Sequence, residues 1–351
     1  MRSALTSALL CGLAIGAAAQ ERQVTFEEPQ PVTVTGFAVG TAAYDRSQRS
    51  NTLTAGKLAV SFFKPAGDAY FFGQLTTALE NSEPSTEIDN LIVSWTPHTA
   101  TQWSLAFGRF DAPIGFERDD EPLNLIATNS FNFEFGRPSK LTGAILRLTA
   151  SPRFELAAAA ADGWDVPVDN NRGKTALLRA QWLPLDRFTV GVTGLYGPER
   201  DASDAHQRSL LSPDLTLDLG RLIVGAELNL GREREPGGDL TWGGGAATVF
   251  LRLGRSLAVA GRYDHLSDAD GVVSGTPQVL RSVTIGPMWF YSQAQEGIFS
   301  NIEHTRFHLP QIALRAALRI DYSTQPFFLA SSSGGLERTD TRGVVELVYL
   351  F

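Results

Sequence analysis

Histidine, serine and acidic residues are the types with which this sequence could carry out catalysis, and their spacing does not favour it. The five histidines are scattered along the chain, and neither a G-x-S-x-G nor an H-E-x-x-H motif occurs. His304 and His308 have the spacing of a zinc pair on one helical face, but no third ligand is evident. We therefore expect no catalytic residues, no metal site and no bound cofactor.

Two segments rich in oxygen side chains could bind calcium. Asp268 and Asp270 precede Gly271 in one of them, and the segment 162–171 contains three aspartates and two asparagines. Calcium takes oxygen ligands of this kind. Asp, Asn and Gly are also favoured in turns because of their backbone behaviour. We favour turns, with calcium binding as the alternative.

The elements that position these residues show a period of two. From Gln311 to Tyr322, apolar side chains share one face while Gln311, Arg315, Arg319 and Asp321 share the other. Segments of this kind have the length that a tilted strand needs to cross a bilayer, and Gly, Pro, Asp and Asn separate them. The sixteen predicted strands are 31–44, 52–63, 68–80, 86–96, 101–110, 139–149, 152–162, 173–183, 186–197, 209–219, 220–231, 240–253, 255–265, 276–290, 309–322 and 342–351.

This pattern predicts an all-β fold, a transmembrane antiparallel β-barrel of sixteen strands, with fourteen or eighteen as alternatives. A soluble two-sheet sandwich would also alternate. Short and long connections alternate along the chain, as they do in outer-membrane barrels. Aromatic residues such as Trp95, Trp289 and Tyr349 fall on the apolar face near one end of the strands, while Tyr196 and Tyr322 do so near the other. Two aromatic belts favour the membrane barrel.

The two ends of the chain predict export and insertion. Residues 1–19 have a positive start, an apolar stretch and a small-residue cleavage site, so they read as a signal peptide that contains the only cysteine, Cys11. Residues 20–30 are expected to be a short periplasmic segment, and 31–351 a single barrel. The chain ends with Leu347, Tyr349 and Phe351 on one strand face, which we expect to be the insertion signal for the barrel assembly machinery.

Several segments resemble a known family. They are GRFDAPIGFE (108–117), DGWDVPVDNNRGKT (162–175), LYGPE (195–199), RYDHLSDADG (262–271), GTPQVLRSVTIGP (275–287) and RIDYSTQPFF (319–328). In this order and spacing, the chain resembles the OmpL-like β-barrel porins over nearly its whole mature length. The resemblance implies an outer-membrane location and a pore, and it implies no enzymatic residues. The long segment 291–308 departs from the family pattern.

The third external connection, 111–138, is predicted to fold into the lumen and narrow it, because it carries many apolar groups that an exposed loop would not. An exposed surface loop is the alternative. Charged residues are predicted to line the constriction and the lumen. Those of the loop are Asp111, Glu117, Arg118, Asp119, Asp120 and Glu121, and those at inward strand positions are Arg147, Arg179, Arg315 and Arg319. These arginines could form one side of a transverse field, or they could pair locally and brace the wall.

The resulting functional prediction is a porin for passive diffusion of small hydrophilic solutes and ions, in contact with outer-membrane lipid. A sixteen-stranded lumen is wide enough for water, which suits a charged lining. A substrate-specific channel and a closed structural or receptor barrel are the alternatives. A formal charge of -8 without a basic stripe argues against nucleic acid as a partner. Analogy with porin-like barrels suggests a homotrimer.

Overall fold

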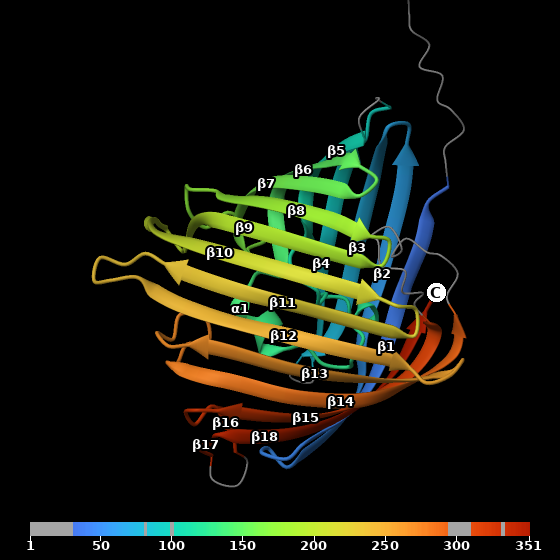
Figure 1. Ribbon diagram of the computed structural model, residues 1–351, viewed down its shortest axis with the longest axis vertical. Helices are drawn as coiled ribbons and strands as arrows, with labels where there is room; N and C mark the ends of the chain where they lie inside the picture. Colours follow the sequence, from blue (N-terminus) through green and yellow to red (C-terminus); the bar gives the residue numbers. More distant parts are fainter. Residues whose placement is uncertain (1–30, 81–82, 99–101, 294–309, 331–333) are drawn as a thin grey trace, which may run out of the picture. The chain divides into compact units, whose positions relative to one another are not determined.

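The computed structural model describes residues 31–80, 83–98, 102–293, 310–330 and 334–351. Within these residues, sixteen strands close into an antiparallel barrel (Figure 1). Consecutive barrel strands pair with each other, and the last barrel strand also pairs with the first. The barrel strands are β1 (Thr33–Asp45), β2 (Ser50–Ala66), β3 (Ala69–Glu80), β4 (Glu83–Trp95), β5 (Gln102–Asp111), β6 (Lys140–Ser151), β7 (Phe154–Trp164), β8 (Thr175–Leu185), β9 (Phe188–Arg200), β10 (Ser203–Asp218), β11 (Leu222–Glu233), β12 (Leu240–Arg252), β13 (Leu257–Asp268), β14 (Gln278–Gln293), β15 (Pro310–Ser323) and β18 (Thr339–Leu350). The predicted fold and strand number are confirmed.

The first and last strands close the barrel. β1 pairs with β18 from Phe37 opposite Leu350 to Asp45 opposite Arg342. Beyond this ladder, the backbone N–H groups of Gly36 and Phe351 each donate to the other's carbonyl, at 2.9 and 3.0 Å. Closure leaves no unpaired sheet edge between the first and last strands, which a membrane barrel requires.

Alternation sorts the side chains as the sequence predicts. On β15, Arg315 and Arg319 are buried and face inward, while Leu314 and Leu318 are exposed on the outer face. The same outer face elsewhere carries exposed Trp, Tyr, Leu, Val and Ile side chains. Leu347, Tyr349 and Phe351, predicted as the insertion signal, are all exposed. An apolar outer surface of this kind suits contact with lipid.

Most strand boundaries differ from the prediction by a few residues, and two differences are of another kind. β10 begins at Ser203, six residues before the predicted start, so only residues 201 and 202 separate it from β9. Residues 203–208 lie outside the predicted strand because they are mostly polar, but ladder hydrogen bonds need no apolar face and extend past the apolar part of the strand. The predicted connection 323–341 contains a short hairpin of β16 (Phe328–Leu329) and β17 (Leu336–Glu337).

Some predictions concern residues that are not described. The signal peptide at 1–19 and the periplasmic segment at 20–30 lie outside the described residues, as does most of the long segment 291–308. Among the residues that are described, none of the helices has the length and apolar character to span a membrane.

The connection between β5 and β6, residues 112–139, is called L3 below. It contains a short 3-10 helix, η1 (Glu121–Leu123), and a helix, α1 (Phe131–Gly136). Figure 1 shows α1 inside the ring of strands, and it contacts β11, β12, β13 and β14. Apolar residues of L3, including fully buried Ile114, pack with inward residues of the wall in two clusters. The predicted inward fold of this loop is confirmed.

Candidate functional site

L3 crosses the lumen and contacts the wall on several sides. Near its start, the Pro113 carbonyl accepts a hydrogen bond from the Thr193 hydroxyl of β9, at 3.2 Å. Further along, the Arg315 guanidinium of β15 donates to the carbonyls of Glu121 and Asn124, at 2.7 and 3.1 Å. The loop is therefore held by well-separated strands of the barrel, in addition to its two ends.

Glu227 of β11 is the first anchor of L3. Its Oε2 accepts the backbone N–H groups of Phe116 and Glu117, at 2.6 and 3.1 Å, and its Oε1 accepts from Asn132 Nδ2 and Arg137 Nε, at 3.0 and 3.3 Å. The carboxylate is buried and all these donors come from L3. One inward carboxylate thus joins the beginning and the end of the loop.

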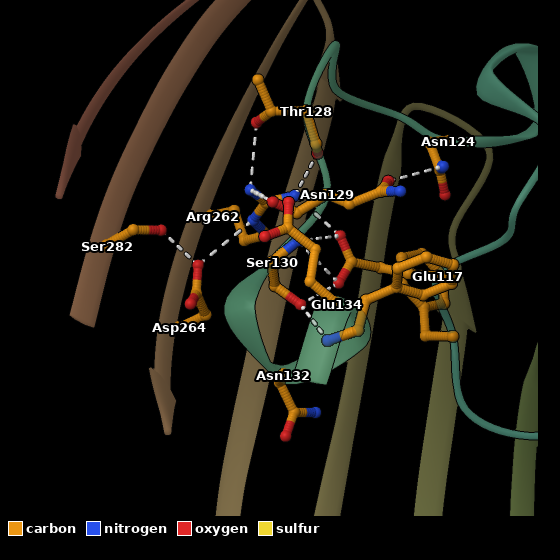
Figure 2. A network of polar contacts seen from close by, with 12 residues as sticks. Glu117, Asn124, Thr128, Asn129, Ser130, Asn132, Glu134, Arg262, Asp264 and Ser282 are labelled. Atoms are coloured by element: carbon orange, nitrogen blue, oxygen red, sulfur yellow. Dashed lines mark hydrogen bonds and ion pairs between the residues drawn. The ribbon is translucent and has the colours of Figure 1, made fainter. Parts of the chain in front are cut away.

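Arg262 of β13 is the second anchor (Figure 2). Its NH1 lies 2.7 Å from Glu117 Oε1, and its NH2 donates to the Thr128 hydroxyl and the Asn129 carbonyl, at 3.0 and 2.7 Å. The guanidinium is fully buried, as a paired and hydrogen-bonded arginine can be. Burial raises the pKa of Glu117, and the positive charge of Arg262 opposes this shift.

The same region fixes both ends of α1. Ser130 is the N-cap, and its hydroxyl accepts the Phe133 N–H at 3.0 Å while it donates to Glu117. The Phe131 N–H donates to Asp264 of β13 at 3.1 Å. At the other end, Trp242 Nε1 donates to the Gly136 carbonyl at 3.0 Å. Figure 2 shows Ser130 between Glu117 and the helix, so the cap and the anchor form one network.

At the root of L3, one lysine holds three carboxylates. Lys140 Nζ lies 2.7 Å from Asp89, 2.5 Å from Asp111 and 3.1 Å from Asp119. Asp89 belongs to β4, next to the irregularity in its pairing with β3, and the ladder between β4 and β5 starts only at Leu91. Lys140 therefore ties β4, the end of β5 and L3 together where the chain leaves the wall.

Two further acidic residues of L3 lie beside this root. Asp120 is buried, and its Oδ1 accepts a hydrogen bond from Gln74 Nε2 at 2.9 Å. Burial, together with the nearby charge of Asp111, raises the pKa of Asp120 well above its usual range. Burial also acts on Asp119, but Lys140 and Lys57 outweigh it and lower the pKa of that residue. Glu121 pairs with Lys57 Nζ at 3.2 Å.

The structure places the predicted wall arginines on the inward face and gives most of them local partners. Arg179 pairs with Asp214 at 2.6 Å, Arg315 with Glu346 at 2.5 Å and Arg319 with Asp321 at 2.6 Å. All three are nearly buried. Arg147 is instead exposed. This geometry favours the interpretation in which these three arginines brace the wall.

The predicted loop residues divide into two groups. Glu117 belongs to the anchor network, whereas Asp111, Asp119, Asp120 and Glu121 gather at the root. Arg118 is partly buried, and its NH1 donates to the Ile114 and Gly115 carbonyls, at 3.5 and 3.3 Å. The loop therefore keeps Arg118 close to its own backbone.

Sequence reasoning missed several residues of this site: Gln74, Asp89, Asn132, Arg137, Lys140 and Trp242. Trp242 lies on the same face of β12 as Gly244 and Ala246, so strand parity alone is enough to place it inside the barrel. Asp89 lies where the β3–β4 pairing shifts, which parity does not reveal. Lys140 acts through residues far apart in the sequence, and no local signal marks it.

The two candidate calcium segments use their oxygens in turns. Asp268 accepts the backbone N–H groups of Val272, Val273 and Ser274, at 2.8, 3.0 and 2.7 Å. In the other segment, Lys174 pairs with Asp162 and Asp169, at 3.2 and 2.5 Å. These contacts favour the interpretation as turns.

One group within the described part of the chain has the geometry to hold a metal ion. It consists of His206, Glu233 and Glu235. Arg200 and Arg208 already pair with Glu233, both at 2.6 Å, and Arg200 also pairs with Glu235. The arginines supply the positive charge that a metal ion would bring, so this group carries no metal assignment.

Comparison with solved structures agrees with this architecture. OmpT of Vibrio cholerae superposes with a TM-score of 0.64 at 10% identity, covering 92% of this chain and 100% of that one. An anion-selective porin from Comamonas acidovorans gives 0.63 at 11% identity, covering 92% and 99%. The outer membrane channel DcaP of Acinetobacter baumannii gives 0.60 at 12% identity, covering 91% and 97%. At such low identity these likenesses concern the fold.

The family comparison covers nearly the whole chain. No curated protein matches it. A family model described as "Putative beta-barrel porin-2, OmpL-like" matches residues 24–351. The chain therefore belongs to this OmpL-like β-barrel porin family and is a porin of the bacterial outer membrane.

Proposed function

We propose that this porin works by passive diffusion of small hydrophilic solutes and ions, and that L3 forms its constriction. The observation that carries the proposal is the anchored path of L3 across a closed barrel with polar inward positions. Partly exposed charged residues on L3, such as Asp119 and Glu121, fit contact with water in the lumen. Such an arrangement narrows a channel without needing a moving part.

The proposed partners of this porin lie in the same membrane. The barrel assembly machinery would insert the chain through its aromatic C-terminus, and outer-membrane lipid would cover the apolar face. We also propose assembly as a homotrimer. The trimer form of OmpT from Vibrio cholerae shares the fold, with a TM-score of 0.55. Chemical cross-linking of intact membranes would detect trimers.

Planar-bilayer recording and liposome swelling test the proposal. The purified protein should conduct in KCl and admit small sugars without saturation. Removing residues 117–124 should raise the single-channel conductance and admit larger sugars, because the loop then loses bulk and the ion pair between Glu117 and Arg262. Saturable block by one solute would indicate a substrate-specific channel. A folded protein that conducts no ions would indicate a closed structural or receptor barrel, and an unchanged cutoff after the deletion would contradict the constriction.

A further inference from the structure

Three arginines of the wall, Arg179, Arg262 and Arg315, cannot present their charge to a solute in the lumen. The side chain of Arg262 is 0% exposed, that of Arg315 3% and that of Arg179 6%. Each is also paired with a carboxylate within 2.7 Å. A paired and buried guanidinium contributes little field at a distance, because its partner cancels it. These three cations therefore hold L3 and the strands in place.

The carboxylates at the root of L3 are different, because they outnumber their cations. Among the described residues, five carboxylates gather there with Lys57 and Lys140 as their paired ammonium groups. The excess is three negative charges when all are ionised, and two when Asp120, whose pKa is raised by burial, holds its proton. The five are Asp89, Asp111, Asp119, Asp120 and Glu121. Three of them reach solvent, since the side chains of Asp111, Asp119 and Glu121 are 25%, 26% and 33% exposed. Lys140 is only 4% exposed and Lys57 17%.

We infer that the L3 root makes this channel prefer cations, with Asp111, Asp119 and Glu121 as the residues that determine the preference. The inference rests on the proposed channel function. A partly exposed excess of negative charge in a narrow lumen attracts small cations and repels anions. Positively charged hydrophilic solutes share this chemistry with K⁺ and should be favoured in the same way.

The exposed arginine of the wall does not reverse this balance. Arg147 lies on β6 opposite Ser104 and Ala157, seven residues along the strand from Lys140. At about 3.3 Å per residue, this separation places it more than 20 Å from the L3 root. That distance exceeds the screening length at physiological salt, so Arg147 acts on a different part of the lumen.

Reversal potentials across a KCl gradient test the inference. The wild-type channel should prefer K⁺ over Cl⁻, and Asp119→Asn with Glu121→Gln should lower the permeability ratio by about twofold or more. Both changes keep the side-chain size, and the shift should grow at low salt. Asp186→Asn is the matched control, because Asp186 is 74% exposed in the β8–β9 turn and should leave the ratio unchanged. Correct folding of every variant is checked by its heat-dependent gel mobility.

The outcomes separate the two claims. A Cl⁻ preference in the wild-type channel, or an unchanged ratio in the double variant, would overturn the cation preference while leaving the channel intact. Complete absence of ion conductance from folded protein would overturn the proposed function and this inference with it. An equal shift in Asp186→Asn would show that general surface charge, and not the L3 root, sets the ratio.

Discussion

A carboxyl group buried inside a barrel is stabilised either by pairing with a cation or by taking up a proton. Glu117 and Asp120 of L3 illustrate these two cases. Glu117 is buried and has the fully buried guanidinium of Arg262 as its partner. Asp120 is equally buried, yet its side chain receives one hydrogen bond from Gln74. The charges facing it are Asp111 of β5, Asp89 of β4, Lys140 of β6 and Lys57 of β2. Burial and the two aspartates outweigh the two lysines, so the pKa of Asp120 is raised.

Asp120 should therefore weaken the fold when it is ionised. Because its pKa is raised above that of an unfolded carboxyl group, the folded state gains stability as the pH falls through the raised pKa, and the cost is present in full above it. Asp120→Asn retains an acceptor for Gln74 and removes the charge. We expect the variant to melt higher than wild type at pH 8, by about 2 °C per kcal/mol gained, and the difference to vanish in acid.

Thermal unfolding in detergent, followed by circular dichroism between pH 8 and pH 4, measures this effect. Asp186→Asn should not change the melting temperature in the same way, since its side chain is exposed. An Asp120→Asn variant that melts below wild type at pH 8 would mean that the ionised carboxylate stabilises L3 instead.

From the sequence, the residues that face the lumen are easier to predict than the residues that they contact. Strand parity correctly predicts that Arg179, Arg315 and Arg319 point inward, because alternation is a local property of a strand. Their partners depend on the registers between strands and on the path of L3. Asp214 lies on a strand that is not next to the one that carries Arg179, and no local pattern reveals such a pair.

At the level of elements, the strands were predictable and the inner path of L3 was not. Apolar and polar side chains alternate along most of each barrel strand, so period two locates it. The inward course of L3 followed from its apolar content, but its anchors on Glu227 and Arg262 required the structure. The Glu227 anchor also depends on the backbone conformation of L3 at Gly115, which a residue with a side chain would not readily adopt.

Gly115 is the residue where that geometry is tightest. Its φ of +69° lies in the left-handed region, and a Cβ there would come 2.1 Å from Glu227 Oε2. Gly115→Ala should therefore push Glu227 away from the Phe116 and Glu117 amides and loosen L3. We expect frequent conductance fluctuations in bilayer recordings and faster protease cleavage within L3, while the barrel itself stays folded.

Gly194→Ala is the matched control for this change. Gly194 lies on β9, its φ is not positive, and a Cβ there would have open space around it. This variant should record like wild type. A quiet, protease-resistant Gly115→Ala channel would show that the Glu227 anchor is not needed to hold the loop.

At the level of the whole molecule, an even number of antiparallel strands decides on which side of the barrel the two ends lie. β1 and β18 are neighbours in the barrel, so both ends of the described barrel lie on the same side of it. We assign that side to the periplasm, as in outer-membrane barrels of even strand number. Connections that follow odd-numbered strands up to β13 then face the cell exterior.

Cysteine labelling on intact cells tests this sidedness together with the signal peptide. Val168, between β7 and β8, and Ala269, between β13 and β14, are exposed on the predicted outer side, whereas Ala66 lies at the β2–β3 turn on the opposite side. With residues 1–19 removed, the chain loses Cys11 and has no other thiol, so single cysteines report without background. We expect Val168→Cys and Ala269→Cys to react with a membrane-impermeant maleimide, and Ala66→Cys to react only after the outer membrane is opened. Labelling of the protein without an added cysteine would show that the segment containing Cys11 is retained. Labelling of Ala66→Cys alone on intact cells would show that the two sides of the barrel are the reverse of those assigned here.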